Sequence, residues 1–157
     1  MHIVPVAVSY EWESCDILKT LELYESQFAK YTKKPGEDLN SILTGISQPK
    51  GRVHIEICEP ISRMELMKLE QLTSNEYHKA VARLLDERIN KAYRLYPNNY
   101  IAYDLRYGTR KYQDFYTPQQ KEEFLAHVRE LEHYDTCDIE MLKDIYLGIY
   151  ANPVNNK

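Results

Sequence analysis

Residues 3–10 read Ile-Val-Pro-Val-Ala-Val-Ser-Tyr, a nearly continuous apolar run. Strands that are covered on both faces have this composition, as in parallel sheets with helices above and below. Pro5 lacks a backbone N–H, so we expect it near a strand end or facing an unpaired side. The run predicts an interior strand over about residues 2–10.

A second strand is predicted over about residues 52–58 (RVHIEIC), because apolar and polar residues alternate there. Its apolar side, expected to be buried, consists of Val53, Ile55 and Ile57. A sheet of two strands is marginal by itself. Since the first strand has the composition of one with neighbours on both sides, we expect part of the sheet to be missing. The chain is then the tail of a larger α/β unit, or another copy supplies the partner strands.

The rest of the chain carries helical patterns. Helices are expected over residues 16–32, 37–46, 62–70, 74–96, 118–132 and 138–150. Thr73 and Glu76 form a capping box, and Pro118 suits the first position of a helix. The predicted fold class is α/β leaning mainly α, with a small sheet. It forms a single domain of residues 1–157, in which 1–61 end an α/β unit and 62–157 form a helical tail.

The composition is that of an ordinary globular protein, with 43% hydrophobic and 28% charged residues in a chain of 157. No stretch approaches the roughly 18 apolar residues that span a bilayer, and no secretory signal is recognisable. The three cysteines are scattered, which favours a reducing compartment. We therefore expect a soluble, cytoplasmic protein.

The net charge of -4 argues against a nucleic-acid partner. The middle of the chain is nevertheless basic and rich in tyrosine, which suits the headgroups of anionic lipids. The candidate anionic-lipid surface consists of Lys79, Arg83, Arg88, Lys91 and Arg94. The alternatives are that charged helix faces complement one another and that the tyrosines pack helices together.

The sequence contains no complete catalytic or cofactor motif. There is no Gly-rich phosphate loop, no G-x-S-x-G, no H-E-x-x-H and no metal spacing, so we expect no cofactor, no metal and no catalytic residue. His133 and Asp138 match His-x4-Asp in a polar connector, which we interpret as accidental. Cys15 is expected to be a packing thiol. Glu11 and Glu13 are interpreted as a solvated strand end, with an acid/base pair as the alternative.

Three segments, in this order, resemble the last blocks of the glycerol-3-phosphate and lysophosphatidate acyltransferase family. Ile-Val-Pro-Val at 3–6 resembles a strand of that family. Residues 51–57 (GRVHIEI) with 59–61 (EPI) are similar to its closing strand, roughly g-x-v-x-v-x-x-g-x-P-I. Residues 77–104, with YRLYPNNY at 93–100, look like the helical tail of a bacterial branch. The resemblance covers about the first 100 residues.

The resemblance implies acyl transfer from acyl-CoA or acyl carrier protein to a lysophosphatidate-type acceptor. In the family, a His-x4-Asp block and a Glu-Gly-Thr block precede the I-V-P-V strand, so this chain alone is expected to be inactive. Only Val4, Pro5 and Val6 map onto a family motif, as support at the wall of the substrate pocket. The family also implies a location peripheral to the inner face of the membrane.

Two other functions remain open. The second candidate function is that of a non-enzymatic helical interaction module whose N-terminal strand adds to the sheet edge of a partner. The exposed sheet edge also offers a route to a homo-oligomer. A nucleic-acid binder is the third alternative, which the net charge disfavours.

Overall fold

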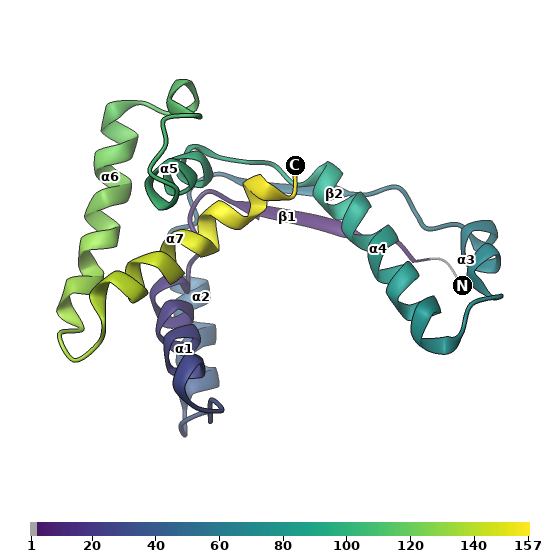
Figure 1. Cartoon of the computed structure of the whole chain (residues 1–157), viewed down its shortest axis with the longest axis horizontal. Helices are drawn as coiled ribbons and strands as arrows, with labels where there is room; N and C mark the ends of the chain where they lie inside the picture. Colours follow the sequence, from purple (N-terminus) through teal and green to yellow (C-terminus); the bar gives the residue numbers. More distant parts are fainter. Residues whose placement is uncertain (1–2) are drawn as a thin grey trace. The chain divides into compact units, whose positions relative to one another are not determined.

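The computed structural model describes residues 3–157. It is mainly helical, with 62% of residues in helices and a small antiparallel sheet of two strands, which confirms the predicted fold class. The chain forms two compact units, and their segments alternate along the sequence (Figure 1). The sheet unit contains residues 3–9, 53–94 and 156–157, and the helical unit contains residues 10–52 and 95–155.

The sheet pairs β1 (Val6–Tyr10) with β2 (Val53–Ile57). The Cys58 N–H donates to the Pro5 carbonyl at 3.0 Å, and the Ile61 N–H donates to the Ile3 carbonyl at 2.8 Å. Residues 3–5 therefore continue the pairing as an isolated bridge rather than as strand, and His2 lies outside the described residues. The prediction of a first strand covered on both faces is wrong, because Val6 and Val8 are exposed.

Two helices complete the sheet unit, α3 (Arg63–Leu69) and α4 (Ser74–Ala92). Capping boxes open both, and the one at Thr73 and Glu76 confirms the prediction. Arg88 of α4 joins the two helices, because its Nη2 donates to Glu65 Oε1 at 2.7 Å. Hydrogen bonds from the Ser62 backbone, the Ser62 hydroxyl and Arg88 lower the pKa of Glu65 to about 2.

Because the pKa of Glu65 is lowered in the folded state, the free energy of unfolding of the sheet unit depends on pH. A carboxyl group whose folded pKa lies below its ordinary value stabilises the fold above that value. For Glu65 the contribution is present above pH 4.5 and is lost as the pH falls toward about 2. In Glu65→Gln we expect a flatter pH dependence of the urea midpoint over this window, measured by circular dichroism. Glu70→Gln, an exposed position one residue beyond α3, is the matched control. Equal slopes for the wild type and Glu65→Gln would contradict the assignment.

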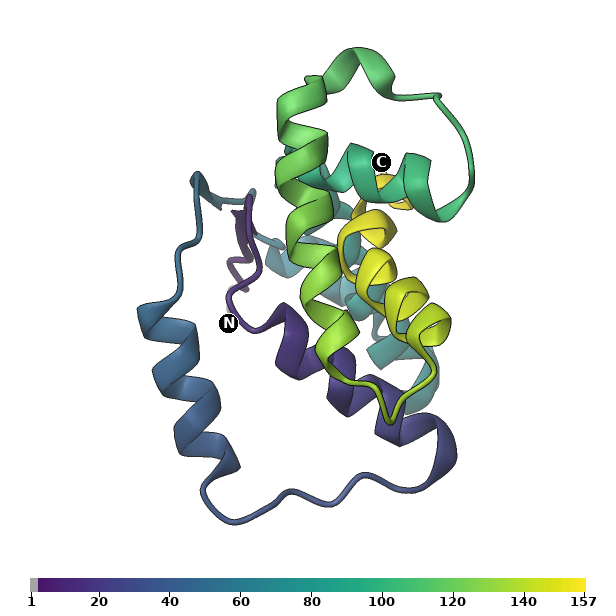
Figure 2. The ribbon, with the colours of Figure 1, turned by 90° about the vertical axis from the view of Figure 1, so that its left-hand side faces the viewer.

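The helical unit is built around α7 (Ile139–Asn155), which packs against α1 (Asp16–Phe28) and α5 (Pro97–Arg106). α6 (Pro118–Arg129) packs against α5, as Figure 2 also shows. α2 (Glu37–Ser47) and the short 3₁₀ helices η1 (Gln113–Phe115) and η2 (Glu130–His133) complete the unit. Its core consists of Ile101, Ala102, Phe124, Val128, Leu131, Leu142, Tyr146, Tyr150 and Ala151.

α5 is the helix that the sequence did not predict. Pro97 occupies its first turn, and the Asn99 side chain accepts a hydrogen bond from the Tyr96 N–H at 2.8 Å. The preceding helix, predicted to reach residue 96, ends at Ala92, because Tyr93 adopts an extended backbone with ψ 131°. Tyr96, the residue before Pro97, is extended as well. α7 runs five residues beyond its predicted end and contains Pro153 in its last turn. Burial of the neighbouring Val154 favours this continuation.

Two polar anchors fix α7 in the helical unit. The Asp16 carboxylate of α1 accepts hydrogen bonds from the hydroxyls of Tyr146 at 2.8 Å and Tyr150 at 2.7 Å. On α5, Arg106 binds both oxygens of Asp144 at 2.9 and 3.0 Å. A Cβ at Gly148 would lie 2.8 Å from Arg106 Nη1, so a larger residue there would make the guanidinium shift from its place beside Asp144. α7 is thereby held on both sides.

Candidate functional site

The most unusual surface of the sheet unit is one apolar face of its two-stranded ribbon. The hydrogen bond from Cys58 to Pro5 sets a register in which Val6 lies opposite Ile57 and Val8 opposite Ile55. Alternate side chains of a strand point to the same side, so these four share a face. We call the apolar ribbon face the set Val4, Val6, Val8, Val53, Ile55 and Ile57, which are 48, 49, 37, 47, 65 and 75% exposed.

On the opposite face of the ribbon, the β1 side chains are covered, whereas His54 of β2 is half-buried and Glu56 is exposed. Ala7 and Ser9 are fully buried, and the Ser9 hydroxyl accepts a hydrogen bond from the Arg94 N–H at 2.9 Å. The prediction that the Val53, Ile55 and Ile57 side of β2 is buried is therefore wrong. No third strand joins the ribbon within residues 3–157. A face of this kind suits an apolar protein surface or further strands of a sheet.

The predicted pocket-support residues divide between the two sides of the ribbon. Val4 and Val6 lie on the apolar ribbon face, whereas Pro5 is buried and uses its carbonyl to pair with Cys58. Val8 and Ile55 belong to the same face but were not among the predicted site residues. The alternation in both strands was the signal that places them there.

Four of the five residues of the predicted anionic-lipid surface are exposed, and the fifth binds other residues of the chain. Lys79, Arg83, Lys91 and Arg94 are exposed. Arg88 is different, because it binds Glu65 and also donates from Nε to the Glu59 carbonyl at 2.9 Å. Asp86 and Glu87 line a shallow hollow together with Arg83 and Lys91, so the exposed side of α4 carries both signs of charge. The lipid assignment of this surface stays a prediction.

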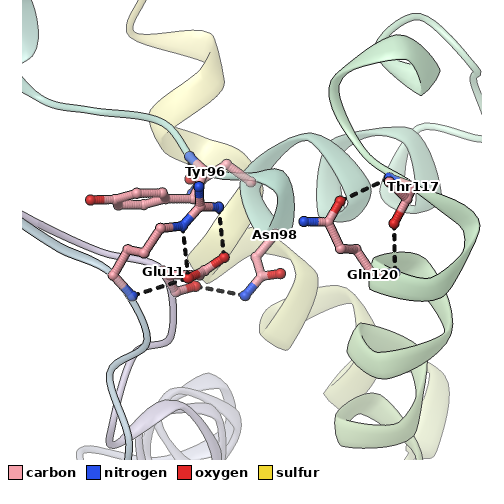
Figure 3. Close-up of polar contacts among 7 residues, drawn as sticks. Glu11, Tyr96, Asn98, Thr117 and Gln120 are labelled. Carbon is pink, nitrogen blue, oxygen red and sulfur yellow. Dashed lines mark hydrogen bonds and ion pairs between the residues drawn. The ribbon is translucent and has the colours of Figure 1, made fainter.

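In the helical unit, Glu11 anchors the chain rather than forming an acid/base pair with Glu13. Its carboxylate accepts hydrogen bonds from Arg52, with Nη2 to Oε1 at 2.8 Å and Nε to Oε2 at 3.1 Å. Figure 3 shows the labelled Glu11 beside Asn98 of α5. These bonds lower the pKa of Glu11. The Glu11 carbonyl accepts a hydrogen bond from the Asn98 side chain at 2.6 Å, which links the segment after β1 to α5. Gly51 has φ +61°, and a Cβ there would lie 2.7 Å from Glu11 Oε2.

A cavity of about 500 Å³ lies where α1 begins, lined in part by Trp12, Cys15 and His127. Burial and the carboxylates of Glu13 and Asp16 raise the pKa of the Cys15 thiol. The thiol donates to the Ser41 carbonyl at 3.5 Å, which agrees with a packing role. A raised pKa disfavours the thiolate that nucleophilic chemistry requires.

His133 and Asp138 do not act on each other. The His133 Nδ1 lies 2.9 Å from the Glu130 carbonyl, whereas Asp138 Oδ1 accepts a hydrogen bond from the Met141 N–H at 3.1 Å. Asp138 thus stabilises the first turn of α7, and His133 has no carboxylate to orient it among the described residues.

The tyrosines of the basic middle pack on one another. Ring centroids of Tyr100 and Tyr112 lie 5.2 Å apart, and those of Tyr103 and Tyr112 lie 5.0 Å apart. Asp104, which is 4% exposed, fixes the following loop, and its partners are the Thr109 hydroxyl at 2.7 Å, the Tyr112 N–H at 3.1 Å and the Tyr116 hydroxyl at 2.9 Å. Burial and Asp104 raise the pKa of Tyr116 to about 12.

Two further observations bear on function. Within residues 3–157, no helix combines the length and the apolar character that a membrane crossing requires. In the same residues, no group of three or more His, Cys, Asp or Glu side chains is placed to hold a metal ion. Comparisons with family models, with curated proteins and with solved structures found no match for this chain.

Proposed function

We propose that this chain is the C-terminal part of a glycerophospholipid acyltransferase and that its ribbon completes the sheet of the catalytic α/β unit. The observation that carries the proposal is the apolar ribbon face, on which six aliphatic side chains are exposed while Ala7 and Ser9 on the opposite side of β1 are buried. Such a face is unfavourable in water, and further elements of an α/β unit would cover it.

The position of the resembling segments supports the same proposal. The I-V-P-V segment leads into β1, and the segment that resembles the closing strand of the family forms β2. Two segments that are separate in sequence are thus neighbours in the sheet. The helical segment that follows them becomes α4 and the start of α5.

In the proposed reaction, the free hydroxyl of a lysophosphatidate-type acceptor attacks the carbonyl of an acyl thioester. The C–O bond forms, the C–S bond breaks, and the thiol of coenzyme A or of acyl carrier protein leaves. A His-x4-Asp histidine accepts the hydroxyl proton and returns it to the leaving thiolate. In this chain, Val4, Pro5 and Val6 support the wall of the pocket, and the enzyme works at the inner face of the membrane.

The first test is to determine the nucleotide sequence upstream of the Met1 codon. We expect the coding sequence before the Met1 codon to contain, in frame, a His-x4-Asp block followed by Glu-Gly-Thr. Their absence from both the same reading frame and a neighbouring gene would contradict the proposal. It would then favour the second candidate, a non-enzymatic module that pairs through the exposed ribbon.

The second test measures acyl transfer from acyl-CoA to lysophosphatidate by the intact enzyme. Val8→Asp with Ile55→Asp places two charges on the apolar ribbon face, and we expect activity to fall at least about tenfold because these charges oppose burial. In the isolated chain the same pair should lower stability by about 1–2 kcal/mol, because aspartate disfavours strands and the two charges lie opposite each other. Circular dichroism therefore has to show that the variant is folded at the temperature of the assay. Gln71→Glu with Asn75→Asp is the matched control, because Gln71 is exposed in the connection before α4 and Asn75 is exposed in its first turn. Unchanged activity of the ribbon variant would refute the role of this face.

A further inference from the structure

The helix α2 is amphipathic, and its apolar side is turned away from the helical unit. Its apolar residues recur at steps of three and four and form one stripe. The α2 stripe consists of Leu39, Ile42, Leu43 and Ile46, which are 62, 58, 57 and 74% exposed. No residue of α2 is buried. An ordinary surface helix turns such a stripe toward the core.

The polar side of α2 is the one that contacts the helical unit. Ser41, Thr44 and Gly45 lie opposite the stripe and are partly covered. The Ser41 carbonyl accepts a hydrogen bond from the Cys15 thiol, and the Gly45 carbonyl accepts one from Lys50 at 2.5 Å. In Figure 2 the ribbon of α2 lies apart from that of α1. The bond from Lys50 is local to the end of α2, whereas Cys15 lies at the start of α1, and its Sγ is also 3.7 Å from the position of a Cβ at Gly45. Cys15 thus contacts the polar side of α2, and the α2 stripe faces outward.

The loop that leads into α2 is basic. Residues 29–36 contain Lys30, Lys33 and Lys34 and no acidic residue. Lys33 and Lys34 form ion pairs with Asp38 and Glu25, in which their side chains stay 63 and 72% exposed. Exposed pairs of this kind contribute little and exchange readily for other anions. Lys30 is exposed and has no ion-pair partner within the described residues.

We propose that α2 lies in the interface of a phospholipid membrane that contains anionic lipids, with the α2 stripe among the acyl chains. Lys30, Lys33 and Lys34 then contact the lipid phosphates. The helix has eleven residues and is about 16 Å long, so it lies along the surface. The inference rests in part on the proposed function, because the acceptor and product of that reaction are membrane lipids. An apolar groove in a protein would cover the stripe but would leave Lys30 without an ion-pair partner.

The test is sedimentation of the full chain with vesicles of phosphatidylethanolamine and phosphatidylglycerol, compared with vesicles of phosphatidylcholine. We expect the wild type to bind the anionic vesicles. Ile42→Asp with Ile46→Asp should lower the partition coefficient at least about tenfold, because two apolar side chains leave the membrane. Lys30→Gln with Lys33→Gln and Lys34→Gln should lower it about tenfold or more, and should weaken its dependence on salt.

The matched control is Asn40→Asp with Ser47→Asp, which adds the same charge to exposed positions beside the stripe. This variant should bind at least about tenfold more tightly than the Ile42→Asp, Ile46→Asp variant, since both carry the same added charge and only the control keeps its apolar side chains. Thermal melts followed by circular dichroism should place all variants within a few degrees of the wild type, since every substituted side chain is exposed.

Failure of the wild type to bind anionic vesicles overturns the inference and assigns the stripe to a protein partner. Equal losses in the stripe variant and the matched control also overturn it. The proposed function is tested separately with a soluble short-chain acceptor. If the intact enzyme acylates that acceptor but α2 binds no membrane, the inference alone fails. If α2 binds membranes but the intact enzyme transfers no acyl group, the proposed function alone fails.

Discussion

Replacing Phe124 with alanine is expected to lower the free energy of unfolding of the helical unit by about 3–5 kcal/mol. The Phe124 ring is fully buried, and it stacks on Trp12 with ring centroids 5.8 Å apart. It also meets Tyr146 at 5.9 Å and Tyr150 at 5.3 Å. The substitution removes a ring on which Trp12 and two tyrosines of α7 pack, and it leaves a cavity that these rigid aromatic neighbours cannot close.

The measurement is urea unfolding followed by the fluorescence of Trp12, the only tryptophan in the chain. Phe28→Ala is the control, because the Phe28 ring is 69% exposed and the same atoms are removed. We expect the control to lose less than about 1 kcal/mol. Similar losses for the two variants would mean that Phe124 does not lie in the core.

Replacing Asp104 with alanine is expected to lower the free energy of unfolding of the helical unit by about 3 kcal/mol. The carboxylate accepts hydrogen bonds from the hydroxyls of Thr109 and Tyr116 and from the Tyr112 N–H. Without it, these donors lose their acceptor in a partly buried site. The pKa of Tyr116, raised to about 12, should also fall, because the anionic neighbour that opposes its ionisation is gone.

Urea unfolding gives the change in stability, and ultraviolet titration of the phenols gives the change in the pKa of Tyr116. Asp114→Ala serves as the control, since Asp114 is exposed in the same loop. It should change stability by less than about 0.5 kcal/mol. A stable Asp104→Ala variant with an unchanged tyrosine titration would show that the loop is held by other contacts.

The starts of the two helices that follow a capping threonine were predicted correctly. α4 begins at the Thr73 and Glu76 capping box, and α6 begins at Thr117 and Pro118 as expected. α5 was missed because Pro97 was interpreted as the end of the preceding helix, although proline also suits the first position of a new one. Asp104 was counted only as an acid in a basic stretch. Its partners lie five to twelve residues further on, where only the folded loop brings them together.

For the two candidate surfaces, the sequence predicted which side chains share a face but not whether that face is buried. Alternation in residues 52–58 told which side chains share a face, but periodicity does not tell what covers that face. The same holds for α2, whose apolar spacing predicted a helix while its orientation depends on the contacts of Ser41 and Gly45. The interleaving of the two units depends on contacts over long sequence separations, which local patterns do not encode.

The hydrogen bond between Tyr146 and Asp16 joins residues 130 positions apart, which has a consequence for biogenesis. Contacts of such long range form late, because much chain entropy is lost in closing the intervening loop. At ordinary translation speeds, α7 leaves the ribosome on the order of ten seconds after α1. During this interval α1 lacks its main neighbour and exposes Ile17 and Leu21, which pack against the core in the finished fold. The nascent chain therefore passes through a stage in which chaperones would protect it from aggregation.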